Sequence, residues 1–246
     1  MSAEPRATHP PLHITVVYNN VAHAPGLTTA WGFAAVVATG ANRVLFDTGG
    51  DGPTLLANLQ QLGIDPDSID AVVLSHIHGD HTGGLDDFLA RNAKVTVYLP
   101  QSFPAAFRRR VEARGARVET VVGPRRLFAN LYSTGEMGSG TKEQALIVDT
   151  AAGLVVITGC AHPDIVEIAR ATRAYMGKDI YLLMGGFHLL GHSEHDLRAT
   201  VQALRKLGVR KVAPSHCTGD AAIALFRARW GNDFIEGGCG AVIEVP

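Results

Sequence analysis

Cysteines, aromatic residues and net charge are all scarce in this sequence. Three cysteines in 246 residues are too few, and odd in number, for a disulfide framework, which leads us to expect a cytoplasmic protein. Aromatic residues make up 7% of the chain, which argues against a base-stacking surface for nucleic acid. The formal net charge is −1, so we expect no basic surface for nucleic acid or for a membrane.

Long apolar runs are also missing. No run approaches the roughly 20 residues that a membrane-spanning helix needs. Residues 1–12 are polar and contain three prolines, so we expect a flexible tail there rather than a signal peptide. Hydrophobic residues make up 46% of the chain, which is enough for a sizeable core. No linker or repeat interrupts residues 13–246, and this predicts a single domain.

Apolar strand-like segments alternate with amphipathic helix-like segments, which predicts an α/β protein. The predicted strands are residues 13–20, 31–39, 43–50, 70–75, 94–100, 116–122, 143–150, 153–162, 179–186, 209–216 and 240–245. The predicted helices are residues 52–64, 85–92, 103–115, 164–176, 193–208 and 220–230. Strand pairs that alternate with β-α units indicate two mixed sheets covered by helices.

The stretch VLSHIHGDHTGGL, residues 73–85, places three histidines and one aspartate within six positions after an apolar strand. Its three glycines disfavour a regular helix and favour a tight loop in which side chains can converge. Imidazole and carboxylate groups suit zinc, iron or manganese. In an extended stretch His76 and His78 can share one metal, while Asp80 and His81 face a second. The alternative is a polar turn with unrelated histidines.

Three more histidines follow apolar strands. His162, His188 and His216 each end such a strand, which predicts a shared site at one edge of the sheets. A single histidine in such a place is commonly structural, but together with the motif they indicate metal binding. Cys160 and Cys217 lie close to two of these histidines. A thiolate could replace a histidine ligand, and buried packing is the alternative.

These motifs resemble those of the metallo-β-lactamase fold superfamily. HIHGDH matches its H-x-H-x-D-H signature, and LFDTGG, TGCAH and the late histidine match further segments. Within it, LSHIHGDHTGGL, VVITGCAHPDIV, GGFHL and SHCTG look like the branch named for 7,8-dihydropterin-6-methyl-4-(β-D-ribofuranosyl)aminobenzene 5′-phosphate synthase. The resemblance implies an αβ/βα four-layer sandwich. It also implies one or two divalent metal ions at the sandwich edge, with zinc favoured and iron or manganese as alternatives.

The resemblance also assigns the ligands. The first metal would be bound by His76, His78 and His162, and the second by Asp80, His81 and His216. The superfamily's bridging aspartate is absent, because Gly186 stands at its place. His188 could compensate as a ligand or as a proton donor, so Asp80 and His188 are the catalytic candidates. With few anionic ligands, the second metal site is expected to be weak or to be completed by a substrate phosphate.

Three further residues are candidates for supporting roles. Asp47, in LFDTGG, is expected to orient a ligand histidine or the loop, and a simple turn-forming aspartate is the alternative. Asn20 and Trp31 could orient a pterin-like ring by hydrogen bonding and stacking. A structural or surface role is the alternative for both.

Three functions fit such a site. The first is hydrolysis of a phosphate-bearing or ester small molecule, because a bound metal lowers the pKa of water toward ~7. The second, implied by the branch resemblance, is transfer from a pterin-methyl diphosphate to an organic acceptor. The third is a non-enzymatic, metal-bound sensing or binding protein, which would have closed metal coordination. The expected partner is a small-molecule substrate, and the sequence leaves a homo-oligomer open.

Overall fold

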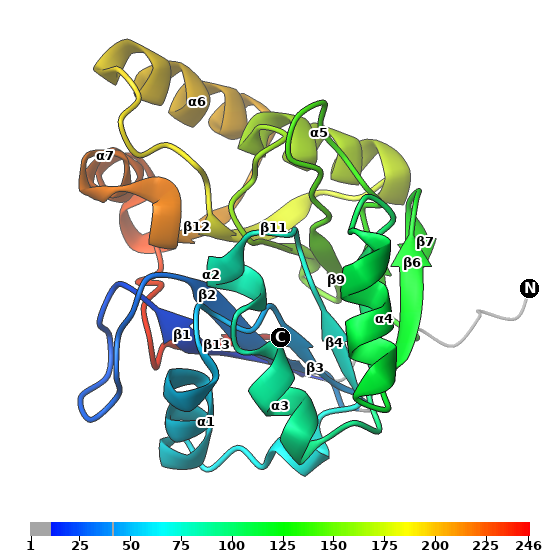
Figure 1. Cartoon of the computed structure of the whole chain (residues 1–246). Helices are drawn as coiled ribbons and strands as arrows, with labels where there is room; N and C mark the ends of the chain where they lie inside the picture. Colours follow the sequence, from blue (N-terminus) through cyan, green and yellow to red (C-terminus); the bar gives the residue numbers. More distant parts are fainter. Residues whose placement is uncertain (1–10, 41) are drawn as a thin grey trace, which may run out of the picture.

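Two mixed β-sheets face each other and carry helices on their outer sides (Figure 1). The computed structural model describes residues 11–40 and 42–246, so most of the expected tail lies outside the described residues. The first strand, β1, already begins at the buried residue Leu12. The predicted α/β architecture of two helix-covered sheets is confirmed.

The first sheet has the strand order β13-β1-β2-β3-β4-β5-β6. Its pairs from β13 to β3 are antiparallel and those from β3 to β6 are parallel. The strands are β1 Leu12–Asn19, β2 Phe33–Ala38, β3 Arg43–Phe46, β4 Ala71–Val73, β5 Thr96–Pro100, β6 Arg117–Val121 and β13 Val242–Val245. The helices that belong to this half are α1 Gly52–Gln61, η1 Pro66–Ser68, α2 Gly79–Thr82, α3 Leu85–Arg91 and α4 Ala105–Ala113.

The second sheet has the order β12-β11-β10-β9-β8-β7, and its strands β10, β11 and β12 run parallel. The strands are β7 Arg125–Arg126, β8 Leu131–Ser133, β9 Leu146–Thr150, β10 Gly153–Thr158, β11 Ile180–Gly186 and β12 Lys211–Ser215. The helices are α5 Ile165–Met176, α6 Glu194–Lys206, η2 His216–Thr218, α7 Asp220–Trp230 and η3 Gly231–Asp233. The short strands β7 and β8 were not predicted, because neither has an alternating apolar pattern of useful length.

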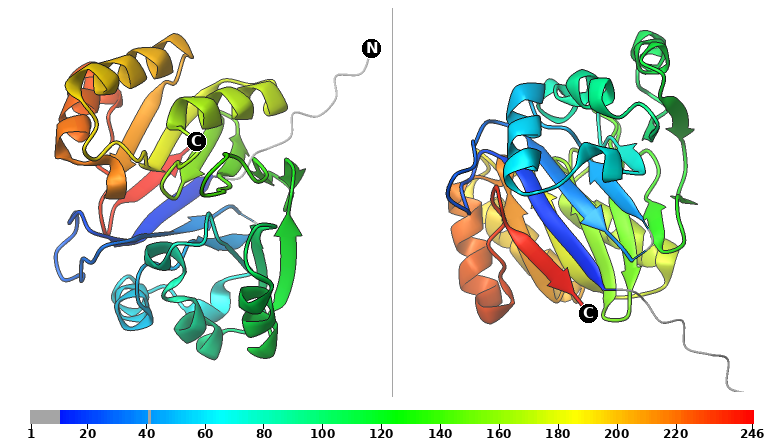
Figure 2. Two further views of the ribbon diagram at one scale, coloured as in Figure 1. Left: turned by 45° about the horizontal axis from the view of Figure 1, so that its top comes forward. Right: turned by 90° about the horizontal axis from the view of Figure 1, so that it is seen from below.

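The core is built by the two-residue periodicity of the strands. In β10, Val155 and Ile157 face the other sheet and belong to the apolar layer between the sheets. Their neighbours Leu154 and Val156 face outward and pack against the layer under α5, α6 and α7. Figure 2 shows helices on the outer side of each sheet, so that central strands such as β10 are buried on both faces. Within the described residues, no helix is long and apolar enough to cross a bilayer.

Candidate metal site

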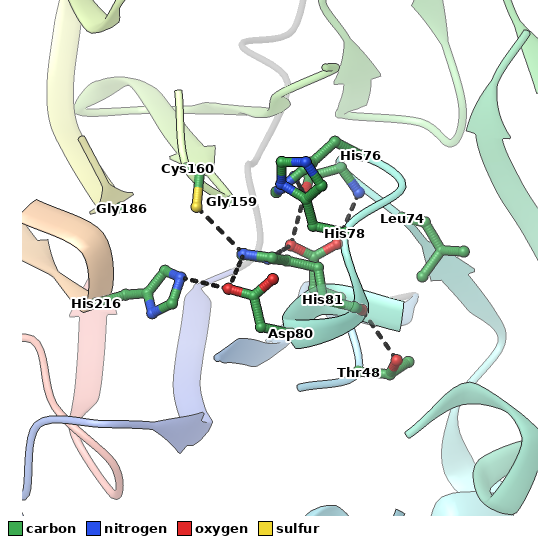
Figure 3. Close-up of polar contacts among 12 residues, drawn as sticks. Thr48, Leu74, His76, His78, Asp80, His81, Gly159, Cys160, Gly186 and His216 are labelled. Atoms are coloured by element: carbon green, nitrogen blue, oxygen red, sulfur yellow. Dashed lines mark hydrogen bonds and ion pairs between the residues drawn. The ribbon is translucent and has the colours of Figure 1, made fainter. Parts of the chain in front are cut away.

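The candidate residues gather where strands of the two sheets end side by side. The first half contributes the segment after β4, and the second half contributes the segments after β10, β11 and β12 (Figure 3). The strands β10, β11 and β12 are parallel neighbours that end at the same edge, and the segment after β4 of the other sheet meets them there, although up to about 140 residues separate these segments. The structure brings His76, His78, Asp80, His81, His162 and His216 into one cluster.

The segment after β4 departs from the expected loop. Residues Gly79–Thr82 form one turn of helix, α2, instead of an irregular stretch. The glycines that follow serve close packing. A Cβ at Gly83 would lie 2.1 Å from the carbonyl oxygen of Gly50, and one at Gly84 would lie 2.2 Å from that of Thr48. The HIHGDHTGG motif therefore packs directly against residues 48–50, and this contact fixes the direction of its potential ligand side chains.

Asp47 orients His81. The carboxylate of Asp47 accepts hydrogen bonds from the amide and the hydroxyl of Ser75, at 2.6 and 2.7 Å, and lies 2.8 Å from Nδ1 of His81. Because a carboxylate only accepts, Nδ1 carries the proton and Nε2 is directed toward the cluster. Burial alone would lower the pKa of His81, but the Asp47 charge and hydrogen bond outweigh it and raise this pKa to about 10.

The first group of potential ligands consists of His76, His78 and His162. Nε2 of His76 lies 3.1 Å from Nδ1 of His78, and the His162 ring centroid lies 4.7 and 4.8 Å from theirs. Nε2 of His162 is buried and has no hydrogen-bond partner within the described chain. Burial lowers the pKa of His76, and it lowers that of His162 to about 4. Both rings are therefore neutral, the form that binds a metal.

The second group consists of Asp80, His81 and His216. Oδ2 of Asp80 lies 3.5 Å from Nε2 of His81 and 3.3 Å from Nε2 of His216. Burial raises the pKa of Asp80, but the contacts with His216 and His81 hold it well below its usual range. Nε2 of His216 is buried and has no hydrogen-bond partner within the described residues.

These spacings fit a metal ion. Ligand atoms about 2.0–2.3 Å from a tetrahedral metal lie about 3.3–3.8 Å from one another. The distances among Asp80, His81 and His216 fall close to this range, and two buried ring nitrogens lack partners. The donor set of imidazoles and one carboxylate therefore fits the divalent metals expected from the sequence.

Asn20 and Trp31 both lie beside His216. Oδ1 of Asn20 is 2.8 Å from Nδ1 of His216, so this amide orients a potential ligand. Trp31 lies with its ring centroid 4.9 Å from that of His216, and 51% of its surface is exposed. Trp31 thus presents an aromatic face at the rim of the site.

His188 lies beside the first group. It is exposed, and its ring centroid is 4.3 Å from that of His162. One of its ring nitrogens lies within 4.8 Å of the sulfurs of Cys160 and Cys217. Gly186, at the expected bridging position, has no room for a side chain. A Cβ there would lie 2.3 Å from the oxygen of Gly159 and 2.7 Å from Sγ of Cys217.

Glu143 is a supporting residue that the sequence analysis missed. Its buried carboxylate accepts backbone hydrogen bonds from Gly159, Cys160 and Ala161 at Oε1 and from His162 at Oε2, at 2.9–3.1 Å. Burial raises its pKa, although these bonds act in the opposite direction. Glu143 thereby fixes the turn that presents His162. The only signal was a charged residue at the head of an apolar strand.

Backbone strain is concentrated at the site. Asp47, Ala161, His188 and His216 have φ of 57°, 61°, 52° and 52°, in the left-handed region. Such a conformation costs a residue with a Cβ roughly 1–2 kcal/mol. All four lie just after a strand end, where the backbone turns a potential ligand or its support toward the cluster.

The family model that matches this chain is that of the metallo-beta-lactamase superfamily, over residues 32–216. The chain belongs to this superfamily. The matched range includes every histidine of the cluster and ends at His216, while Asn20 and Trp31 lie just before it. Divalent metal binding is the usual property of the superfamily, and the donor groups described above are consistent with it.

Relatives and solved structures agree with this membership. A synthase of Methanocaldococcus jannaschii, 7,8-dihydropterin-6-methyl-4-(beta-D-ribofuranosyl)-aminobenzene-5'-phosphate synthase, is 29% identical, with 82% of this chain and 84% of the relative covered. The structure of Tm1679, described as a metal-dependent hydrolase of the beta-lactamase superfamily, is 28% identical. It superposes with a TM-score of 0.80 over 95% of this chain and 99% of Tm1679. YhfI of Bacillus subtilis, at 14% identity and a TM-score of 0.68 over 96% and 100% of the two chains, shares the fold.

Proposed function

We propose that this chain is a metal-dependent hydrolase that acts on a phosphate-bearing or ester small molecule. The observation that carries the proposal is the pair of ligand groups with unpartnered, buried ring nitrogens on His162 and His216. One side of this cluster is open, because His78, His188 and Trp31 are exposed. An open side lets a substrate reach the metal, as catalytic sites require. The similarity to Tm1679 supports a hydrolase.

The residues of the site would have separate roles as metal ligands, as supports of those ligands and as a surface for the substrate. His76, His78 and His162 would hold one metal, and Asp80, His81 and His216 a second. When bound, such a metal supplies a water of lowered pKa and a Lewis acid for a substrate oxygen. Asp47, Asn20 and Glu143 keep the ligand rings and their turn in place. Trp31 offers a flat apolar face to a substrate ring.

His188 is the best-placed proton donor for the leaving group. Its ring is exposed and lies beside His162. Contact with Cys217 raises the pKa of His188, so its ring is protonated over a wider pH range than a free imidazole. Gly186 stands where the bridging aspartate is expected, so no carboxylate at that position could donate the proton instead.

A transferase is the second candidate, favoured by the 29% identity to the archaeal synthase over most of both chains. Both reactions would use the same ligands. They differ in whether water or an organic acceptor attacks the substrate. A transferase predicts turnover only when an arylamine-type acceptor is present, whereas a hydrolase incorporates solvent oxygen into a product.

The test is a substrate panel run in ¹⁸O-labelled water with zinc-, manganese- and iron-loaded protein. The panel contains phosphomonoesters, phosphodiesters, diphosphates, lactones and thioesters, each with and without an arylamine acceptor. We expect one ester class to be cleaved with ¹⁸O in the product, with activity lost in His162→Ala and retained in His192→Ala, an exposed residue outside the site. Acceptor-dependent turnover without ¹⁸O would support the transferase instead. Bound metal with no reaction on any substrate would favour a sensing or binding protein.

A further inference from the structure

We infer that Cys160 is a metal ligand whose thiolate lies between the two groups of histidines and supplies the bridging anion that Gly186 cannot. The inference rests on the proposed metal site and names a ligand beyond those of the first assignment. It follows from where the sulfur lies, from what surrounds Gly186 and from the charge of the site.

The sulfur of Cys160 belongs to both ligand groups. It lies 3.3 Å from Nε2 of His81, which is the spacing expected for two ligands of one metal (Figure 3). Its distances to ligand atoms of Asp80, His81 and His216 are all within 4.8 Å, and so are those to His76 and His162. No carboxylate within the described residues is placed between the two groups in this way.

The space that an aspartate side chain at position 186 would occupy is already filled by neighbouring atoms. A side chain at Gly186 would meet the sulfur of Cys217 at 2.7 Å and the Cα of Cys160 at 3.2 Å. Cys217 in turn has its sulfur 3.7 Å from the carbonyl oxygen of Cys160. The two cysteines thus occupy the region that a β11 aspartate would enter, and the sulfur of Cys160 is the one directed at His81.

Two bound metal ions would favour a thiolate at this place. Imidazole ligands add no negative charge, so the first group would supply none, and Asp80 is the one carboxylate of the second. Two divalent ions held by these groups would carry four positive charges against one negative ligand. A thiolate between them adds a second negative charge, and thiolates bind zinc well. On metal binding the Cys160 S–H bond is broken, the sulfur bonds to the metal and the proton passes to solvent.

The backbone holds Cys160 in this position. Its amide donates to Oε1 of Glu143 at 3.0 Å, and its side chain is 4% exposed. The next residue, Ala161, takes a left-handed conformation that turns the chain back toward His162.

Cobalt spectroscopy and X-ray absorption test the inference. Co²⁺ is titrated into metal-free, reduced protein, because thiolate ligation produces a charge-transfer band in the near ultraviolet that histidine and carboxylate ligands do not. We expect the band in the wild type, its growth through both metal equivalents, its loss in Cys160→Ser and its retention in Cys217→Ser and Cys239→Ser. X-ray absorption of the wild-type zinc form should show a sulfur neighbour near about 2.3 Å, independently of how any variant folds.

The possible results test the role of Cys160 separately from the existence of the histidine metal site. Metal binding without sulfur ligation in either spectrum would overturn the role of Cys160 and leave the histidine site standing. A sulfur signal that disappears in Cys217→Ser and persists in Cys160→Ser would overturn it in favour of the other cysteine. A band that saturates at the first equivalent would refute bridging. Absence of any bound metal would overturn both the inference and the proposed function.

Discussion

Replacing Glu143 by glutamine should loosen the turn that carries Cys160 and His162. In the wild type one buried carboxylate accepts four backbone hydrogen bonds, three at Oε1 and one at Oε2. A glutamine can keep the oxygen toward the three donors, but its NH₂ group must then face the amide of His162. Two buried donors would point at each other, and the remaining bonds would no longer be made to a charged acceptor.

The expected loss in the free energy of unfolding follows from these lost hydrogen bonds. A bond to a charged group contributes about 1.5–3 kcal/mol, and a buried donor left without a partner costs about 1–3 kcal/mol. Part of this is offset, because the neutral amide is cheaper to bury than the carboxylate. We expect a net loss of about 3 kcal/mol in the free energy of unfolding, which lowers Tm by roughly 6–12 °C for a domain of this size. Zinc affinity should fall about 10–100-fold, as for other supporting residues around metals.

The assay combines thermal unfolding of the metal-free protein with zinc titration against a competing chelator. Glu136→Gln is the matched control, since its carboxylate accepts one backbone hydrogen bond, from Ser102, at the surface. That control should stay within about 0.5 kcal/mol of the wild type. A Glu143→Gln protein with wild-type Tm and zinc affinity would refute the account of this turn.

Three further perturbations probe the same site. The pKa of His81 in the metal-free fold is raised to about 10, above its unfolded value, so its stabilisation is complete below about pH 6.5 and is lost as pH rises through 10. Tm of the metal-free protein should therefore fall between pH 7 and 10 more than that of the zinc form, in which metal replaces the Nε2 proton; parallel curves would contradict this. Asp47→Asn removes the charge and one of the two acceptor oxygens that hold Ser75 and His81, so chelator competition should show zinc affinity lowered about 10–100-fold, and an unchanged affinity would count against that role. Gly186→Asp should destabilise the fold by about 2–4 kcal/mol in urea unfolding because it meets Cys217 and the Gly159 oxygen. Adding Cys217→Ala should restore part of that loss, and no restoration would show that the sulfur is not the obstacle.

Much of the architecture could be predicted from local pattern. Strand and helix positions followed the periodicity of apolar residues, and the motif containing His76 and His81 pointed to the edge of the sheets. These signals are local, since they need only a few neighbouring positions to be recognised. The two short strands Arg125–Arg126 and Leu131–Ser133 were missed because pairing, of β8 with β9 and of β7 with β8, makes them strands and not their own pattern.

The contacts of the site that could not be predicted join segments far apart in the sequence. Asn20 lies 196 residues before His216, whose Nδ1 it contacts, so no spacing in the sequence connects them. Glu143 binds the amides of residues 16–19 positions later and acts on backbone groups that have no sequence signature. The crowding around Gly186 likewise became visible only once Cys217 was placed beside it.

The left-handed residues at the site lower the stability of the fold while they hold the potential ligands in position. Ala161 and His188 would each lose their conformational strain if replaced by glycine, a gain of roughly 1 kcal/mol that needs no new contact. A search for heat-resistant variants without selection for metal binding would therefore tend to accumulate changes here, at the cost of the ligand geometry. Thermal robustness in this scaffold is best sought in the helices and outer layers, far from the turns that follow β10 and β11.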